Sequence, residues 1–140
     1  MRNTGCIDKL KTAADKLGLC LVKCGGFYEL EYGQLPICVL ISNTNDSFCL
    51  ISCVYDQDDC LDEELLDIAV DVVTERYEQY SGYWNDALPY FMSPEYIVGA
   101  DVPVTHEWLG KKLDDFYRAS MLLQKSILLM NNASVAACLM

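Results

Sequence analysis

Residues 37–42 and 47–55, I-C-V-L-I-S and S-F-C-L-I-S-C-V-Y, are two short segments that are apolar at nearly every position, and N-T-N-D separates them. Short runs rich in β-branched and aromatic residues predict strands, and the Asn and Asp residues between them predict a turn. A strand with one buried face alternates between apolar and polar residues, whereas these two do not. We therefore expect an antiparallel pair covered on both faces, by helices of the chain or by a second subunit.

The segments before this pair predict a helix and a hairpin. Residues 4–17 place apolar side chains at helical spacing, and Gly18 follows as a stop signal. From residue 19 the pattern changes to L-C-L-V-K-C, then Gly25 and Gly26, then F-Y-E-L-E-Y. Two short runs joined by a pair of glycines are typical of two strands connected by a tight turn.

A second helix is expected from residues 59–62 to about Tyr80. Its apolar residues cover an arc of roughly 200°, about twice the width that a surface helix needs to face its core. A helix this apolar is expected to be buried on two sides, and a homodimer contact is the simplest second side. We predict that contact at five residues of the helix: Leu65, Ile68, Ala69, Val72 and Val73.

The last third of the chain predicts two short strands and a third helix. The clusters Y-F-M (90–92) and E-Y-I-V (95–98) are strand-like, and the nearby Pro and Gly residues exclude a long helix. Thr105 is expected to cap a helix that keeps its apolar spacing to Met130 and ends at Asn131 and Asn132. The predicted fold is a single α+β domain over residues 1–140, in the order α-β-β-β(β)-α-β-β-α, with an antiparallel sheet covered by helices.

The composition indicates a globular, acidic protein. The 140 residues are 52% hydrophobic and 22% charged, and the formal net charge is −11. Ten scattered bases against 21 acids argue against nucleic acid and anionic membranes as partners, since both need clustered Lys and Arg. The chain lacks a run of apolar residues long enough to span a bilayer, and its N-terminus does not resemble a secretion signal. We therefore expect a cytoplasmic protein.

An acidic run, D-Q-D-D-C-L-D-E-E-L-L-D at residues 56–67, raises the question of a calcium loop. An EF-hand loop needs an oxygen ligand at its fifth position and Gly at its sixth, and this run has Cys60 and Leu61 there. Acids at the start of a helix instead cap its free amides and complement its dipole. We interpret the run as a helix N-terminus and expect no metal and no cofactor.

The eight cysteines and the single histidine do not form a recognisable catalytic set. The cysteines lack the C-x-x-C spacing of zinc sites, and in a reducing compartment most are expected to be buried thiols. His106 has Glu107 as its only acidic sequence neighbour and no nucleophile beside it. We therefore expect a protein without catalytic activity, although an enzyme that uses one of the cysteines stays a rival hypothesis.

The closing block E-Y-I-V-G-A-D-V-P-V-T-H-E-W-L-G-K-K-L-D-D-F, residues 95–116, resembles the YbjN pattern of a strand, an acid-containing turn, a Thr or Ser cap and a helix. The order of elements is similar to the type III secretion chaperone-like fold, which includes YbjN-type domains and class I secretion chaperones. The resemblance implies that the second helix pairs subunits. It also implies that apolar patches hold a polypeptide, with candidate contacts Leu10, Leu17, Leu21, Phe27, Tyr28 and Leu30.

From these features we expect a homodimeric module that binds another polypeptide, such as a secreted protein, without catalysis. One alternative is an acidic inhibitor of the immunity-protein type that blocks a basic partner with Asp67, Asp71, Glu75 and Glu78. The other is a regulatory domain with no polypeptide client.

Overall fold

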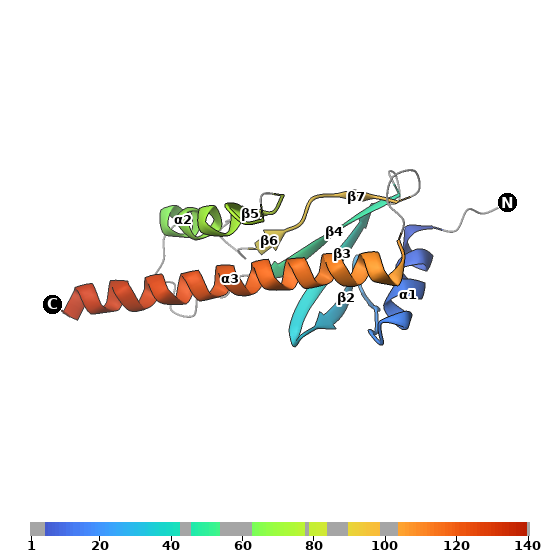
Figure 1. Cartoon of the computed structure of the whole chain (residues 1–140), viewed down its shortest axis with the longest axis horizontal. Coiled ribbons are helices and arrows are strands. Elements are labelled where there is room, and N and C mark those ends of the chain that lie inside the picture. Colours follow the sequence, from blue (N-terminus) through green and yellow to red (C-terminus); the bar gives the residue numbers. More distant parts are fainter. Residues whose placement is uncertain are drawn as a thin grey trace.

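Three helices and seven strands make up the described part of the chain, in the order α1, β1 to β4, α2, β5 to β7, α3 (Figure 1). The computed structural model describes residues 5–42, 46–53, 63–77, 79–83, 90–98 and 104–139, without the side chains of residues 63, 65, 83 and 130–139. The elements are α1 (Cys6–Lys16), β1 (Val22–Cys24), β2 (Phe27–Tyr32), β3 (Leu35–Ser42), β4 (Ser47–Cys53), α2 (Glu63–Thr74), β5 (Ser81–Tyr83), β6 (Tyr90–Met92), β7 (Tyr96–Ile97) and α3 (His106–Leu139).

The strands form one antiparallel sheet in the order β1-β2-β3-β4-β6-β5, and β7 also pairs with β4. The strands β3 and β4 lie at its centre, with Leu40 opposite Cys49 and Cys38 opposite Ile51. The expected hairpin of β1 and β2 is confirmed, and Gly25 in its turn has a φ of 67°, which a residue without a Cβ adopts at low cost. The central apolar segments that predicted strands are thus the middle of the sheet.

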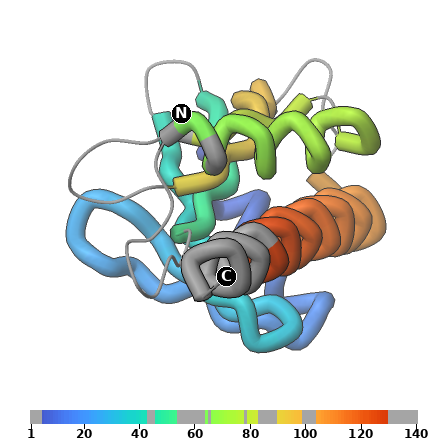
Figure 2. Tube along the Cα trace, turned by 90° about the vertical axis from the view of Figure 1, so that its left-hand side faces the viewer, coloured from blue at the N-terminus to red at the C-terminus, as the bar shows by residue number. Residues whose placement is uncertain are grey.

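Helices α1 and α2 both pack against α3, which lies along one side of the strands (Figure 2). On this side Ile37, Val39, Phe48 and Leu50 alternate along β3 and β4 and are almost completely buried. The long helix α3 packs across them, and the hydroxyl oxygens of Ser52 on β4 and Ser120 on α3 lie 3.2 Å apart. The core therefore sits between one face of the sheet and the three helices.

Several expectations about element boundaries are confirmed. The first helix begins and ends within the predicted range, and Thr105 caps α3, where its hydroxyl accepts a 3.1 Å hydrogen bond from the Trp108 amide. Side-chain capping of this kind satisfies one of the free amides at a helix N-terminus. The α+β class with an antiparallel sheet is also as predicted.

Two expectations about the ends of helices are wrong, and one strand is additional. Helix α3 continues through Asn131 and Asn132 to Leu139, because Asn costs less than about 0.7 kcal/mol in a helix and no Gly or Pro follows it. Helix α2 ends at Thr74 rather than near Tyr80, because the chain must turn for the Tyr80 ring to enter the core beside Phe91. The strand β5 was not expected, since a Ser-Gly-Tyr segment has no clear strand signal.

The acidic run at residues 56–62 lies outside the described residues, as does Glu78, so the interpretation of the run as a helix N-terminus stays a prediction. Within the described ranges, no group of three or more His, Cys, Asp or Glu side chains is placed to hold a metal ion.

Candidate functional site

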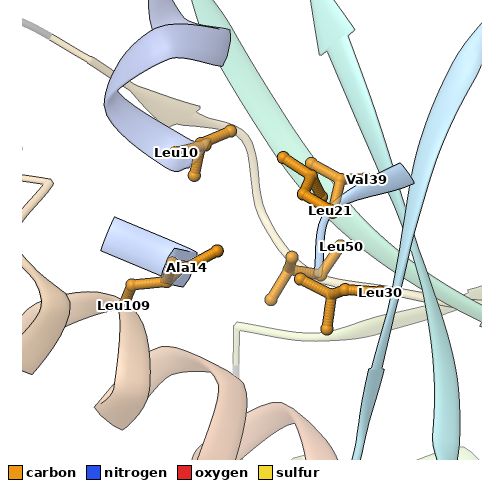
Figure 3. Close-up of a pocket in the computed structure, with 7 residues that line it drawn as sticks. All are labelled: Leu10, Ala14, Leu21, Leu30, Val39, Leu50 and Leu109. Atoms are coloured by element: carbon orange, nitrogen blue, oxygen red, sulfur yellow. The ribbon is translucent and has the colours of Figure 1, made fainter. Parts of the chain in front are cut away.

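Two of the predicted polypeptide contacts, Leu10 and Leu30, are core residues. Figure 3 shows Leu10, Leu21 and Leu30 turned toward one another between α1, the sheet and α3. The gap among them holds about 10 Å³, which is room for at most one water, and its walls are apolar. Leu10 and Leu30 are almost completely buried, so the expectation that they contact a partner is wrong. The apolar spacing of these residues therefore reflects contact with the core rather than an exposed binding surface.

The other predicted contacts are partly accessible. Leu17, Leu21 and Tyr28 are half-buried against the core, and the ammonium of Lys11 lies 5.9 Å from the centre of the Tyr28 ring. Phe27, at the start of β2, is exposed and belongs to the opposite face of the sheet from Tyr28. The predicted contacts therefore do not form one surface.

The predicted dimer residues are also divided between core and surface. Ala69 and Val73 are completely buried, and α2 packs against α3. They are therefore not accessible to a second subunit, which corrects the expectation for these two. Ile68 and Val72 lie one turn apart and are exposed, and the side chain of Leu65 lies outside the described residues.

The second face of the sheet, which we call the open face, is not covered by the parts of the helices that the structure describes. The strand register assigns to it alternate residues of every strand: Val22, Cys24, Phe27, Glu29, Glu31, Pro36, Cys38, Leu40, Ser42, Ser47, Cys49, Ile51, Cys53, Ser81, Tyr90, Met92 and Ile97. The exposed fractions are 50% for Val22, 37% for Phe27, 44% for Leu40 and 57% for Ile97. We expected both faces of the sheet to be covered, by helices or by a second subunit. The described helices cover one face.

The charged side chains of the open face are acidic. Glu29 and Glu31 lie on β2, and Glu95 follows β6 at the other end of the face. The described strands place no Lys or Arg on this face. Lys23 pairs with Tyr28, so both side chains lie on the other face of the sheet, toward the helices. An apolar surface with acids at both ends favours a partner that is apolar and basic.

The open face is hollowed where β3 and β4 meet the segment between β6 and β7. The hollow has a volume of about 510 Å³, and Leu40, Cys49, Met92 and Glu95 line it. The hydroxyl of Ser47, which is completely buried, donates a hydrogen bond to Oε1 of Glu95. Within an apolar hollow, this fixed carboxylate is the charged group that could orient a ligand.

Two thiols of the open face, those of Cys38 and Cys49, are poor candidates for nucleophilic catalysis. Burial raises the pKa of Cys38, and the charges of Cys53 and Glu29 raise it further. Burial also raises the pKa of Cys49, and the charge of Glu95 acts in the same direction. A reactive cysteine needs a lowered pKa, so these surroundings decrease the thiolate fraction at neutral pH.

His106 contacts an acidic side chain on the surface at the start of α3. Its Nε2 lies 3.1 Å from Oε1 of Glu107, and both side chains are substantially exposed. This arrangement resembles a helix N-terminus with an acid in its first turn more than a general base with an oriented partner.

The comparisons with known proteins concern the fold alone. No protein-family model matches the chain, and no curated protein is similar to it in sequence. Among solved structures, the crystal structure of YbjN from E. coli, described as a proposed transcription regulator, has a TM-score of 0.58 with 14% sequence identity. The match covers 89% of this chain and 93% of that chain. The chain therefore has a YbjN-like α+β fold. None of its described helices is long and apolar enough to cross a membrane.

Proposed function

We propose that the protein is a non-catalytic, secretion-chaperone-like module that binds an apolar, basic polypeptide segment on the open face of its sheet. The observation that carries this proposal is the exposure of Val22, Phe27, Leu40 and Ile97 on a face whose charges are acidic. Isolated exposed apolar residues are ordinary, whereas several on one sheet face are typical of a binding surface. The short apolar strands supply this surface because their side chains are apolar on both faces.

Binding would follow from burial and charge. An extended or helical segment laid on the open face removes Phe27 and Leu40 from water, which gives most of the affinity. Glu29, Glu31 and Glu95 steer a basic segment and repel acidic ones, so they contribute mainly to selectivity and association rate. Pairing two copies through this face would bring the same carboxylates together, which disfavours the chain itself as the occupant.

A regulatory domain is the second candidate, favoured by the description of YbjN as a proposed transcription regulator. With a net charge of −11, such a domain would act through a protein partner rather than through direct contact with DNA. The open face would serve that contact equally well, so both candidates share the same surface.

The test is selection from a random peptide library on immobilised wild-type protein, Leu40→Asp and Leu129→Asp. Leu129 is the matched control because it is an exposed leucine on α3, away from the open face. We expect wild type and Leu129→Asp to enrich peptides that combine apolar residues with Lys or Arg, and Leu40→Asp to lose them.

Failure of wild type to enrich any sequence, or equal enrichment by Leu40→Asp, would contradict the proposal. Binding that survives Leu40→Asp but is lost when Asp71 and Glu75 on and after α2 are changed to Lys would instead support the acidic inhibitor.

A further inference from the structure

The hollow of the open face combines an apolar floor with one carboxylate. Leu40 and Met92 come from strands on either side of β4, and Cys49 from β4 lies between them. The volume of about 510 Å³ lies within the range of about 300–1,000 Å³ that is usual for pockets that hold small groups. The hollow is therefore large enough for one long side chain of a bound segment.

The carboxylate of Glu95 is fixed in place while remaining accessible. The donor that holds it, the Ser47 hydroxyl, belongs to a residue that is completely buried in the central strand β4, so this donor has little freedom to move. Glu95 itself is exposed and lines the hollow. Cys49 lines the same hollow, so the carboxylate of Glu95 and this thiol border one space.

A long cationic side chain matches both features. The aliphatic stems of Lys and Arg bury readily along apolar surface while the charged head remains at the edge. Leu40 and Met92 would contact such a stem, and the thioether of Met adapts to groups of different shape. A charge-assisted hydrogen bond from the head to Glu95 would give the selectivity that the apolar floor lacks.

We propose that this hollow is a subsite for one Arg or Lys side chain of the segment bound on the open face, with Glu95 as the residue that recognises the cation and Leu40 and Met92 as the contacts of its stem. This inference rests on the proposed function, since it names the chemistry of the residue that the partner must place there.

The test is an NMR titration of the labelled protein with n-butylguanidinium chloride and n-butylammonium chloride, which stand for the ends of Arg and Lys, and with the neutral n-butylurea. We expect amide shift changes at residues 40–42, 47–49 and 92–95 with the cations and much smaller ones with the urea. In Glu95→Gln, which can still accept the Ser47 hydrogen bond, we expect the affinity for the cations to fall about tenfold or more. Glu107→Gln, which changes an exposed acid at the start of α3 that does not line the hollow, is the matched control and should bind like wild type.

Equal binding by Glu95→Gln and wild type would overturn the subsite, as would shift changes centred on the acids of α2. These outcomes are separate from those of the peptide selection. Peptides enriched without Lys or Arg would leave the open face as a binding surface and reject the subsite. Cation binding in the hollow without any enriched peptide would keep the cation site and reject the polypeptide function.

Discussion

The backbone amide of Cys6 donates a 2.9 Å hydrogen bond to Oδ1 of Asp46, a residue forty positions further along the chain. The residue before Cys6, Gly5, has no side chain that could cap α1. Asp46 therefore takes the role of a capping residue from a distant turn, and its carbonyl also accepts a 3.0 Å hydrogen bond from the Val98 amide. One residue thus connects α1, the turn before β4 and the end of β7.

Removing this cap should lower the stability of the fold. We expect Asp46→Ala to reduce the free energy of unfolding by about 1–2 kcal/mol, the range found for lost N-caps. Asp46 also has a φ of 51°, which Ala adopts poorly, so the loss should lie at the upper end of that range. Urea denaturation measures the difference.

Asp46→Asn is the control, because Asn accepts the same hydrogen bond and tolerates the same backbone conformation. It should remain close to wild type. Equal losses in the Ala and Asn variants would show that the hydrogen bond to Cys6 does not account for the effect.

Tyr80 offers a substitution that should stabilise the protein. Its ring packs edge-on against Phe91 and Phe116, each at 5.6 Å between ring centres, and its hydroxyl oxygen is buried with no hydrogen-bond partner in the described part of the chain. A buried polar group without a partner costs about 1–3 kcal/mol.

We therefore expect Tyr80→Phe to raise the free energy of unfolding by about 1 kcal/mol, because it keeps the ring contacts and removes the unsatisfied hydroxyl. Tyr80→Leu, which removes the ring as well, should lower it by about 1–3 kcal/mol. Thermal unfolding of the three proteins is the measurement, and a Tyr80→Phe variant less stable than wild type would contradict this account of the hydroxyl.

The sequence predicted local structure well where the signal was local. The Gly25 turn, the apolar stripe of α1 and the Thr105 cap each depend on residues within a few positions of one another. The cap of α1 could not be found in this way, because Asp46 lies far from Cys6 in the sequence. No local pattern marks such a contact.

The candidate site was harder to predict because apolar spacing does not say what a residue faces. Leu10 and Leu30 belong to regular apolar patterns, and both side chains are buried in the core of the domain. The sequences of β3 and β4 were more informative, because they are apolar on both faces. This pattern predicts a second apolar surface, and the described helices do not cover it. The position of Glu95 at the edge of that face depends on the return of the chain after β6, which no motif indicates.

High pH should destabilise the protein through Cys6. Burial, with the charge of Asp46 as a second cause, raises the pKa of Cys6 from 9.0 to about 11. The folded state therefore holds its proton between about pH 9 and 11, where the unfolded state has lost it. The raised pKa contributes on the order of 2 kcal/mol to the free energy of unfolding. This contribution is fully present below pH 9 and is lost as the pH rises toward 11.

Urea midpoints measured from pH 8 to pH 11 test this expectation. The urea midpoint should decrease less across pH 9–11 in Cys6→Ala than in wild type. Burial also raises the pKa values of Tyr80 and Tyr96, but both proteins contain these tyrosines. The difference between the two curves therefore reports the contribution of the Cys6 thiol. Parallel curves for the two proteins would contradict the assignment to Cys6.

The exposed side of α2 makes a prediction about self-association. Ile68 and Val72 are 44% and 43% exposed, and the exposed acids Glu64, Asp67, Asp71 and Glu75 surround them. A dimer that pairs these two helices would bury the apolar pair but bring the carboxylates of both copies together. Such a dimer should therefore strengthen as salt screens the repulsion, contrary to an interface held by ion pairs.

Light scattering at low and high salt, with wild type, Val72→Asp and Leu40→Asp, measures this. If α2 pairs the subunits, the mass should approach that of a dimer at high salt, and Val72→Asp should return it to the monomer while Leu40→Asp leaves it unchanged. A wild-type protein that remains monomeric at both salt concentrations would reject the dimer and leave the exposed pair as a surface feature. A dimer that Leu40→Asp dissociates instead would mean that two copies cover each other's open faces, and the proposed partner segment would then have to displace a subunit in order to bind.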